Sequence, residues 1–161
     1  MRSFVFVGGT GRGKTTAVKN ILFQMQGRPI HIYDVNNEYG AGAPESMKDF
    51  LSKMKGVKNS VIVFEEATIF FSHAGRQEQI VDFLVKKRHT NNVLIFVFHS
   101  LRSVPLWILD LIDYVHLFAT NDNVSLIEKK FGNNPSIIEA FKMVQEKCKN
   151  DFHANIFFAP L

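Results

Sequence analysis

Residues 8–15 constrain the chain more than any other segment, because they fill every fixed position of the pattern G-x-x-x-x-G-K-[ST]. Glycines at these positions let the backbone curl so that several N–H groups point inward, and a following helix adds partial positive charge. A turn of this kind binds polyphosphate groups. A glycine-rich turn without a ligand is the alternative, and the flanking sequence decides between the two.

The flanks satisfy the context that the pattern requires, a strand before the turn and a helix after it. Residues 3–7 form an apolar, β-rich run, and residues 15–26 place apolar side chains at helical spacing. We therefore predict a nucleoside triphosphate site. Its predicted binding residues are Gly8, Gly9, Thr10, Gly11, Arg12, Gly13, Lys14, Thr15 and Thr16.

Two residues of this turn have predicted chemical roles. The ammonium group of Lys14 should reach the β and γ phosphates. The hydroxyl of Thr15 should bind Mg²⁺, with Thr16 as the second choice.

A second signal follows the apolar run at residues 61–64, where Glu65 and Glu66 stand side by side. A buried strand that ends in two acids can deliver carboxylates to a metal ion and to an attacking water. We predict that Glu65 holds Mg²⁺, mostly through water, and that Glu66 orients or deprotonates the water. Solvated acids that merely end a strand are the alternative.

Polar residues also follow two other predicted strands. Residues 93–98 are the most apolar run and predict a central strand, after which His99 is a candidate sensor of the γ phosphate. A local hydrogen-bonding role for His99 is the alternative. After the strand at residues 30–33, Asp34 and Glu38 are either site carboxylates or ordinary loop acids.

Composition indicates one globular domain over residues 1–161, because 46% of the residues are hydrophobic and the length suits a single core. The net charge of +4 permits an acidic polymer as partner without demonstrating one. The single cysteine, Cys148, excludes an intrachain disulfide and indicates a reducing compartment. No apolar run reaches the roughly 20 residues of a membrane span, so we expect a soluble, cytoplasmic protein.

Strands and helices are predicted to alternate along the chain, which requires an α/β domain of three layers with a mainly parallel sheet. The predicted strands are residues 3–7, 30–33, 61–64, 93–98, 114–118 and, at the sheet edge, 152–158. The predicted helices are residues 15–26, 44–54, 76–89, 104–111 with Ser103 as its cap, a short helix ending near 131 and a last helix ending near 147.

These elements together resemble the HerA/FtsK superfamily of ATP-driven DNA pumps over nearly the full chain. Residues 34–39 read D-x-x-x-E-Y, as after the second strand of HerA-type ATPases, and Glu65-Glu66-Ala67 is similar to their acid pair. Arg88 to His99 is similar to the basic residue, loop, strand and polar sensor of that superfamily, where the sensor is commonly Gln. The resemblance implies a RecA/FtsK-like P-loop fold and ATP as the substrate.

A core of this length most resembles the genome-packaging ATPases of tailless icosahedral viruses with an internal membrane. That resemblance implies movement of double-stranded DNA into a preformed capsid by a ring of six copies, in the host cytoplasm or virion, with capsid or portal-vertex proteins as partners. It also implies an arginine that completes the site of a neighbouring subunit. Arg88 is the first candidate by motif position, followed by Arg76 and Arg102.

Three rival functions remain open at this stage. The Zot-like assembly ATPases of filamentous phages share the loop, the acid pair and an Arg-His pair like Arg88-His89. Small P-loop kinases share the loop and the size, although no segment here resembles their arginine-bearing lid. A nucleotide-binding scaffold without turnover is the third.

Overall fold

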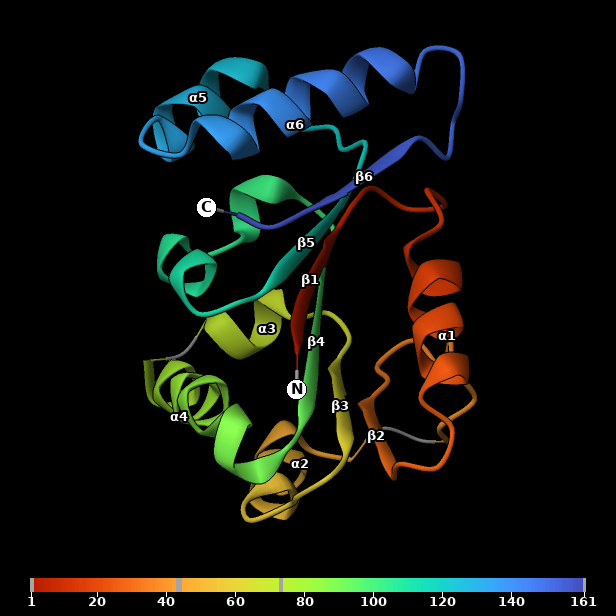
Figure 1. Ribbon diagram of the computed structural model, residues 1–161, viewed down its shortest axis with the longest axis vertical. Helices are drawn as coiled ribbons and strands as arrows, with labels where there is room; N and C mark the ends of the chain where they lie inside the picture. The colour runs from red at the N-terminus through yellow and green to blue at the C-terminus, as the bar shows by residue number, and fades with distance from the viewer. Residues whose placement is uncertain (1, 43–44, 73, 161) are drawn as a thin grey trace.

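A six-stranded sheet runs through the centre of the protein, with helices on both of its faces (Figure 1). The computed structural model describes residues 2–42, 45–72 and 74–160, and the side chains of all of these except residues 74–76. The strands are β1 Ser3–Val7, β2 Ile30–Tyr33, β3 Val61–Phe64, β4 Val93–Phe98, β5 Tyr114–Phe118 and β6 Asn155–Phe158. Their order is β2-β3-β4-β1-β5-β6, and only β6 runs antiparallel to its neighbour.

The two faces of the sheet are covered unequally. α1 (Lys14–Gln24) covers one face, where Val18 and Leu22 pack against Phe4 and Phe6 of β1. The helices on the other face are α2 (Met47–Met54), α3 (Thr68–Phe71), α4 (Ala74–Thr90), α5 (Val124–Phe131) and α6 (Pro135–Lys147). The predicted three-layer α/β fold with a C-terminal edge strand is confirmed.

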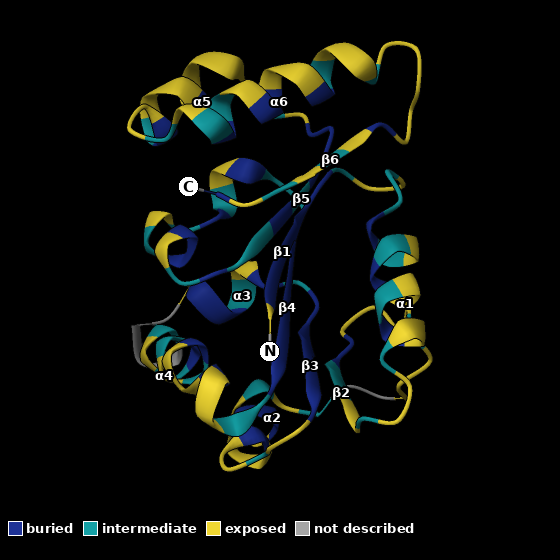
Figure 2. Cartoon of the chain, in the orientation of Figure 1, coloured by how far each residue is buried: buried dark blue, intermediate teal, exposed yellow. Residues whose placement is uncertain are grey.

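The central strands β1, β3 and β4 are buried along their length, as Figure 2 shows by their dark colour, whereas the edge strands β2 and β6 are largely exposed or half-buried. All six residues of β4 and all five of β1 are buried, because these strands lie in the middle of a sheet covered on both sides. Phenylalanines supply much of this core, and Phe64 and Phe96 stack with ring centroids 4.8 Å apart. This packing holds the carboxyl ends of β1, β3 and β4 at one edge of the sheet.

Residues 104–111 differ from the predicted single helix. The structure has two short 3₁₀ turns instead, η1 (Leu101–Ser103) and η2 (Leu106–Asp110), with Ser103 inside the first and not at a helix cap. The cause is Pro105, since a proline disfavours helical backbone at the residue before it. Val104 is accordingly extended, with φ −73° and ψ 121°.

Several boundaries also differ from the prediction. The strand predicted from residue 152 begins at Asn155, because a turn closed by Ala154 N–H and the carbonyl of Asp151 precedes it. α2 begins at Met47, after the side chain of Ser46 caps it, whereas Pro44 lies outside the described residues. The four-residue helix α3 was not predicted, because it is too short to show a periodic pattern.

Candidate functional site

The turn between β1 and α1 has the backbone geometry of a phosphate cradle. Gly11 and Gly13 have φ of +73° and +105°, which favour glycine. A side chain at Gly8 would lie 2.6 Å from the Cβ atom of Phe118, so only glycine fits there. The turn therefore needs its glycines in order to pass close to β5 and enter α1.

The N-terminus of α1 is free to bind an anion. Its first turn has no acidic residue, and Gly13, at its cap position, has no side chain that could accept a hydrogen bond from the helix. Within the described part of the chain, the N–H groups of Lys14, Thr15 and Thr16 have no acceptor. Unpaired N–H groups and the helix dipole together favour a negatively charged ligand at this position.

Lys14 lies in this cradle and is 6% exposed. Its Nζ donates to the carbonyl oxygen of Gly9 at 2.9 Å. Burial lowers the pKa of Lys14, while the nearby Glu65, Glu38 and Glu66 act in the opposite direction. A buried ammonium group with acids on one side is placed to hold an anionic group between itself and the loop.

Glu65 and Glu66 follow β3 at the same edge of the sheet. Glu65 is 1% exposed and accepts a hydrogen bond from the hydroxyl of Tyr39 at 2.8 Å. Burial raises the pKa of Glu65, against the effect of the Tyr39 hydrogen bond. Glu66 has a left-handed backbone with φ of 54°, an uncommon conformation for a residue with a side chain.

His99 faces Glu66 from the end of the neighbouring strand. Its Nε2 lies 2.5 Å from Oε1 of Glu66, and the amide of Asn36 donates to the same oxygen at 3.2 Å. Since β4 lies between β1 and β3, His99 stands between the phosphate cradle and the acid pair. Its Nδ1 is buried and has no hydrogen-bond partner among the described residues.

The loop after β2 joins the site through Glu38, whose role the sequence left open. Thr15 Oγ1 donates a hydrogen bond to Oε2 of Glu38. The loop is anchored by Asp34, which is 2% exposed and accepts from the N–H groups of Glu38 and Tyr39, each at 2.9 Å. Asp34 therefore shapes the loop, whereas Glu38 reaches the phosphate cradle.

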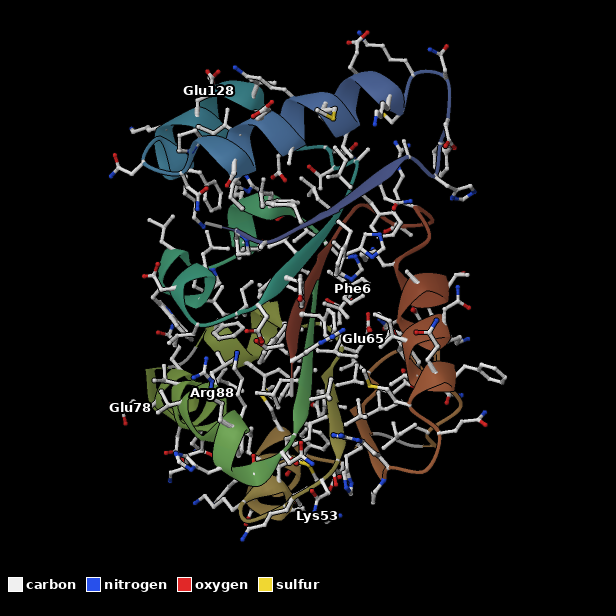
Figure 3. The ribbon with its side chains drawn as sticks, in the orientation of Figure 1. Phe6, Lys53, Glu65, Glu78, Arg88 and Glu128 are labelled. Carbon is white, nitrogen blue, oxygen red and sulfur yellow. The ribbon has the colours of Figure 1, made fainter. Side chains whose placement is uncertain are left out.

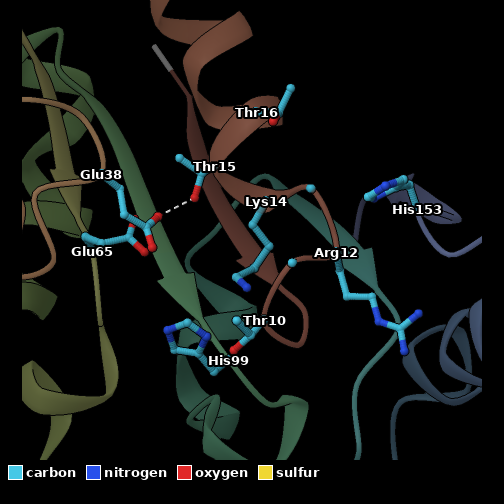
Figure 4. Close-up of a pocket in the computed structure, with 11 residues that line it drawn as sticks. Thr10, Arg12, Lys14, Thr15, Thr16, Glu38, Glu65, His99 and His153 are labelled. Carbon is cyan, nitrogen blue, oxygen red and sulfur yellow. Dashed lines mark hydrogen bonds between the residues drawn. The ribbon is translucent and has the colours of Figure 1, made fainter.

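These side chains surround a cavity of about 420 Å³ (Figure 4). Glu38 and Glu65 stand at one end of it, His99 and Lys14 are nearer the middle, and Arg12 and His153 stand at the opposite end. The lining residues are Thr10, Gly11, Arg12, Gly13, Lys14, Thr15, Thr16, Glu38, Glu65, His99 and His153.

Most of the predicted site residues are therefore together. The residues of the loop from Thr10 to Thr16, with Glu65 and His99, line the cavity, and Glu66 reaches it through His99. Gly8 and Gly9 form the base of the loop, where their N–H groups donate to the carbonyls of Phe98 and Ala119. His153 was not predicted, because it lies 137 positions or more from the loop and no motif marks it.

Arg88 is not in this cavity. It is exposed on α4, on the face of the sheet opposite α1, and Figure 3 shows it away from Glu65. Arg102 lies nearer, beside a second hollow that Thr10 and His99 also line, and it is 70% exposed. The side chain of Arg76 lies outside the described residues.

The oxygen atoms at the acid end suit a magnesium ion. In the described residues no three His, Cys, Asp or Glu side chains are grouped as a complete metal site. Mg²⁺ needs no such group, because it keeps several waters and binds one or two protein oxygens together with substrate phosphates. The Thr15 hydroxyl already lies against a Glu38 carboxylate oxygen, so hard oxygen donors converge there.

The fold and the site define the class of protein. A family model for the AAA ATPases, the ATPase family associated with various cellular activities, matches residues 4–132, so the chain belongs to this family. No curated protein sequence matches the chain. Among the helices that the structure describes, none is long and apolar enough to span a membrane.

Solved structures of a viral protein are similar in fold. One is the genome packaging NTPase B204 from Sulfolobus turreted icosahedral virus 2 in complex with AMP, with a TM-score of 0.68 and 16% identity over 98% of this chain and 92% of that one. Another is B204, the DNA-packaging ATPase from Sulfolobus turreted icosahedral virus, with a TM-score of 0.66 and 16% identity over 99% and 98%. The predicted P-loop NTPase fold is thus confirmed, and the narrower placement in the HerA/FtsK superfamily stays a prediction.

Proposed function

We propose that the chain is a Mg²⁺-dependent ATPase that moves double-stranded DNA into a viral capsid. The observation that carries its hydrolytic part is the contact of Glu66 with His99 beside a cradle of free N–H groups. One side of the cavity can hold a triphosphate, and the other presents a carboxylate to water. The packaging part rests on the B204 proteins, whose names describe genome packaging.

Each protein group has a defined task in hydrolysis. The N–H groups of the loop and Lys14 hold the phosphates and stabilise the charge that develops on the leaving ADP. Glu66 orients a water and accepts its proton as the water oxygen bonds to the terminal phosphorus. His99 holds the Glu66 carboxylate in place and is our candidate sensor of the terminal phosphate.

Mg²⁺ would be held by Thr15, and through water by Glu65, with Glu38 as an additional carboxylate nearby. When bound, the ion neutralises charge on the phosphate oxygens. Tyr39 supports this arrangement because its hydroxyl fixes the Glu65 carboxylate.

A ring of copies, in our proposal a hexamer, would give Arg88 its task. Arg88 is exposed on the face away from its own cavity, so it can complete only a neighbour's site. We expect Arg88→Ala to bind ATP normally and to lose hydrolysis by about 10³-fold, as with other arginines supplied in trans. Mixing it with Lys14→Ala should restore turnover. In a mixed ring, an Arg88→Ala copy keeps its own Lys14 and receives the arginine of a Lys14→Ala neighbour, so some sites are intact. Normal turnover by Arg88→Ala alone would exclude this role.

The proposal is tested by ATP hydrolysis and particle mass, each with and without linear duplex DNA. A DNA-packaging motor should hydrolyse ATP faster with DNA of any sequence, because it grips phosphates and reads no bases. It should also form a ring, in the host cytoplasm or virion, that can dock on capsid or portal-vertex proteins. Transfer of phosphate to a small acceptor would indicate a kinase, and the absence of hydrolysis would indicate a scaffold.

A further inference from the structure

The cavity extends past the residues that phosphates need. Hydrolysis requires the terminal phosphate to lie near Glu66 and His99, at the acid end. The rest of the nucleotide must then leave the cradle in the opposite direction. That direction leads to Arg12, Thr16 and His153 (Figure 4).

The far end is built by the turn at residues 151–154, between α6 and β6. The side chain of Asp151 accepts from the N–H of His153 at 3.0 Å, and its carbonyl accepts from Ala154 N–H at 3.0 Å. These bonds fix the backbone of the turn at His153. A Cβ atom added to Gly13 would lie 3.6 Å from Nδ1 of that ring, so His153 stands directly over the phosphate loop.

Arg12 ties this turn to the loop. Its guanidinium lies 3.8 Å from the centre of the Phe152 ring, and its Nη1 donates to the carbonyl oxygen of Phe152 at 3.1 Å. The rings of Phe152 and His153 are perpendicular, with centroids 5.4 Å apart. Two aromatic rings and a guanidinium are therefore held together at the mouth of the cavity.

This aromatic group is unusually open. Phe152 is 52% exposed and His153 is exposed, although aromatic side chains are mostly buried elsewhere in the chain. Among the described residues, the ring nitrogens of His153 have no hydrogen-bond partner. Exposed aromatic and guanidinium planes are the surfaces on which nucleobases stack.

We propose that the turn at residues 151–154 forms the nucleoside subsite of the cavity, with the base of the nucleotide stacked on the ring of His153. The paired Arg12 and Phe152 form the wall that keeps this ring in place. The proposal rests on the proposed function, because the direction of the nucleotide follows from hydrolysis at Glu66. Stacking does not read the edge of a base, so this subsite accepts adenine and guanine alike.

The test compares Mg·ATP with Mg·tripolyphosphate by calorimetry on the full chain. The two ligands share the phosphates, and only ATP has a nucleoside. The unchanged protein should bind ATP more tightly. His153→Ala should weaken ATP binding about 10-fold and leave tripolyphosphate binding unchanged, in line with the contribution of one stacked base.

Two further variants separate stacking from other roles of these residues. His153→Phe keeps an aromatic plane and should retain ATP affinity. In His153→Ala, the affinities for ATP and for GTP should fall by the same factor. Phe152→Ala should weaken ATP binding by a smaller factor, whereas Phe23→Ala is a matched control, because Phe23 is a 72% exposed phenylalanine on α1 outside the cavity.

The outcomes distinguish this subsite from the proposed function. Equal affinities of the unchanged protein for ATP and tripolyphosphate would overturn the subsite and leave the phosphate loop in place. A parallel loss of both ligands in His153→Ala would also overturn it, because His153 would then act on the loop itself. Binding of neither ligand by the unchanged protein would overturn both the subsite and the proposed function.

Discussion

The two ends of the central sheet each hold a buried lysine, and the two lysines have opposite surroundings. At the amino end, Lys87 is 7% exposed, and its Nζ donates to Ser3 Oγ at 2.7 Å, Leu111 O at 2.8 Å and Asp113 Oδ2 at 2.8 Å. At the carboxyl end, Lys14 is similarly buried but donates only to Gly9 O among the described residues.

An ammonium group has three donors, so Lys87 is saturated and Lys14 is not. Burial alone would raise the pKa of Asp113, but the hydrogen bonds from Lys87 and Ser3 outweigh it and lower that pKa. Burial lowers the pKa of Lys14, against the effect of the nearby Glu65, Glu38 and Glu66. A saturated lysine stabilises the fold, whereas an unsaturated one is placed to bind a ligand.

Among the changes that test this difference between the two lysines, Lys14→Ala should have the largest effect. We expect kcat/KM for ATP to fall by about 10³-fold, because the main cation of the cradle is lost. The Tm should change little, since Lys14 makes few bonds that stabilise the fold. Steady-state hydrolysis and thermal melting test this. Lys48→Ala, at an exposed position of α2, is the control and should alter neither quantity.

Glu66→Gln should separate binding from chemistry at the carboxyl end. The amide keeps the size of the side chain but cannot accept a proton, so kcat should fall by about 10²-fold. ATP should still bind, which calorimetry can measure. Glu78→Gln changes an exposed acid of α4 and serves as the control. If Glu66→Gln retains normal turnover, another residue activates the water.

Lys87→Met should lower stability and leave hydrolysis unchanged, whereas Lys14→Ala should lower hydrolysis and leave stability nearly unchanged. Loss of a buried, fully bonded cation leaves Asp113 and Ser3 without their partner, so the free energy of unfolding should fall by about 2–3 kcal/mol. Hydrolysis per folded molecule should not change. Chemical denaturation is the measurement. The neighbouring Lys86, 60% exposed and paired with Asp82 at 2.8 Å, gives the control Lys86→Met, expected to cost less than about 1 kcal/mol.

The smallest effect is expected from Glu38→Gln, which removes one charge from the carboxyl end. We expect the Mg²⁺ concentration for half-maximal turnover to rise by about 10-fold, as for other residues that support a metal ligand. A magnesium titration of hydrolysis measures this. Glu128→Gln, on α5, is the control. An unchanged titration would mean that Glu38 only positions Thr15 before nucleotide binds.

The parts of the site that are local in sequence were predictable. The loop from Gly8 to Thr15 has a fixed pattern because the close approach of Gly8 to Phe118 and the positive φ of Gly13 both require glycine. Glu65 and Glu66 follow a strand that its apolar run identifies. The alternation of strands and helices likewise predicted the layers of the fold. Such features depend on neighbouring residues alone.

The contacts between distant segments could not be predicted in the same way. Glu38 reaches Thr15 only because Asp34 bends its loop, and His153 reaches Gly13 only because β6 pairs antiparallel with β5. The contact of Lys87 with Asp113 has no signal in the sequence either, because the two residues lie 26 positions apart. The orientation of α4 decides that contact and also places Arg88 away from the cavity.

The left-handed backbone of Glu66 lowers the stability of the fold, whereas its carboxylate serves hydrolysis. Most residue types with a side chain lose stability there, on the order of 1 kcal/mol, whereas asparagine and aspartate lose less and glycine loses none. Selection for thermal stability alone would accordingly favour glycine at position 66. Retention of an acid at position 66 among related proteins would therefore indicate selection for catalysis and not for stability.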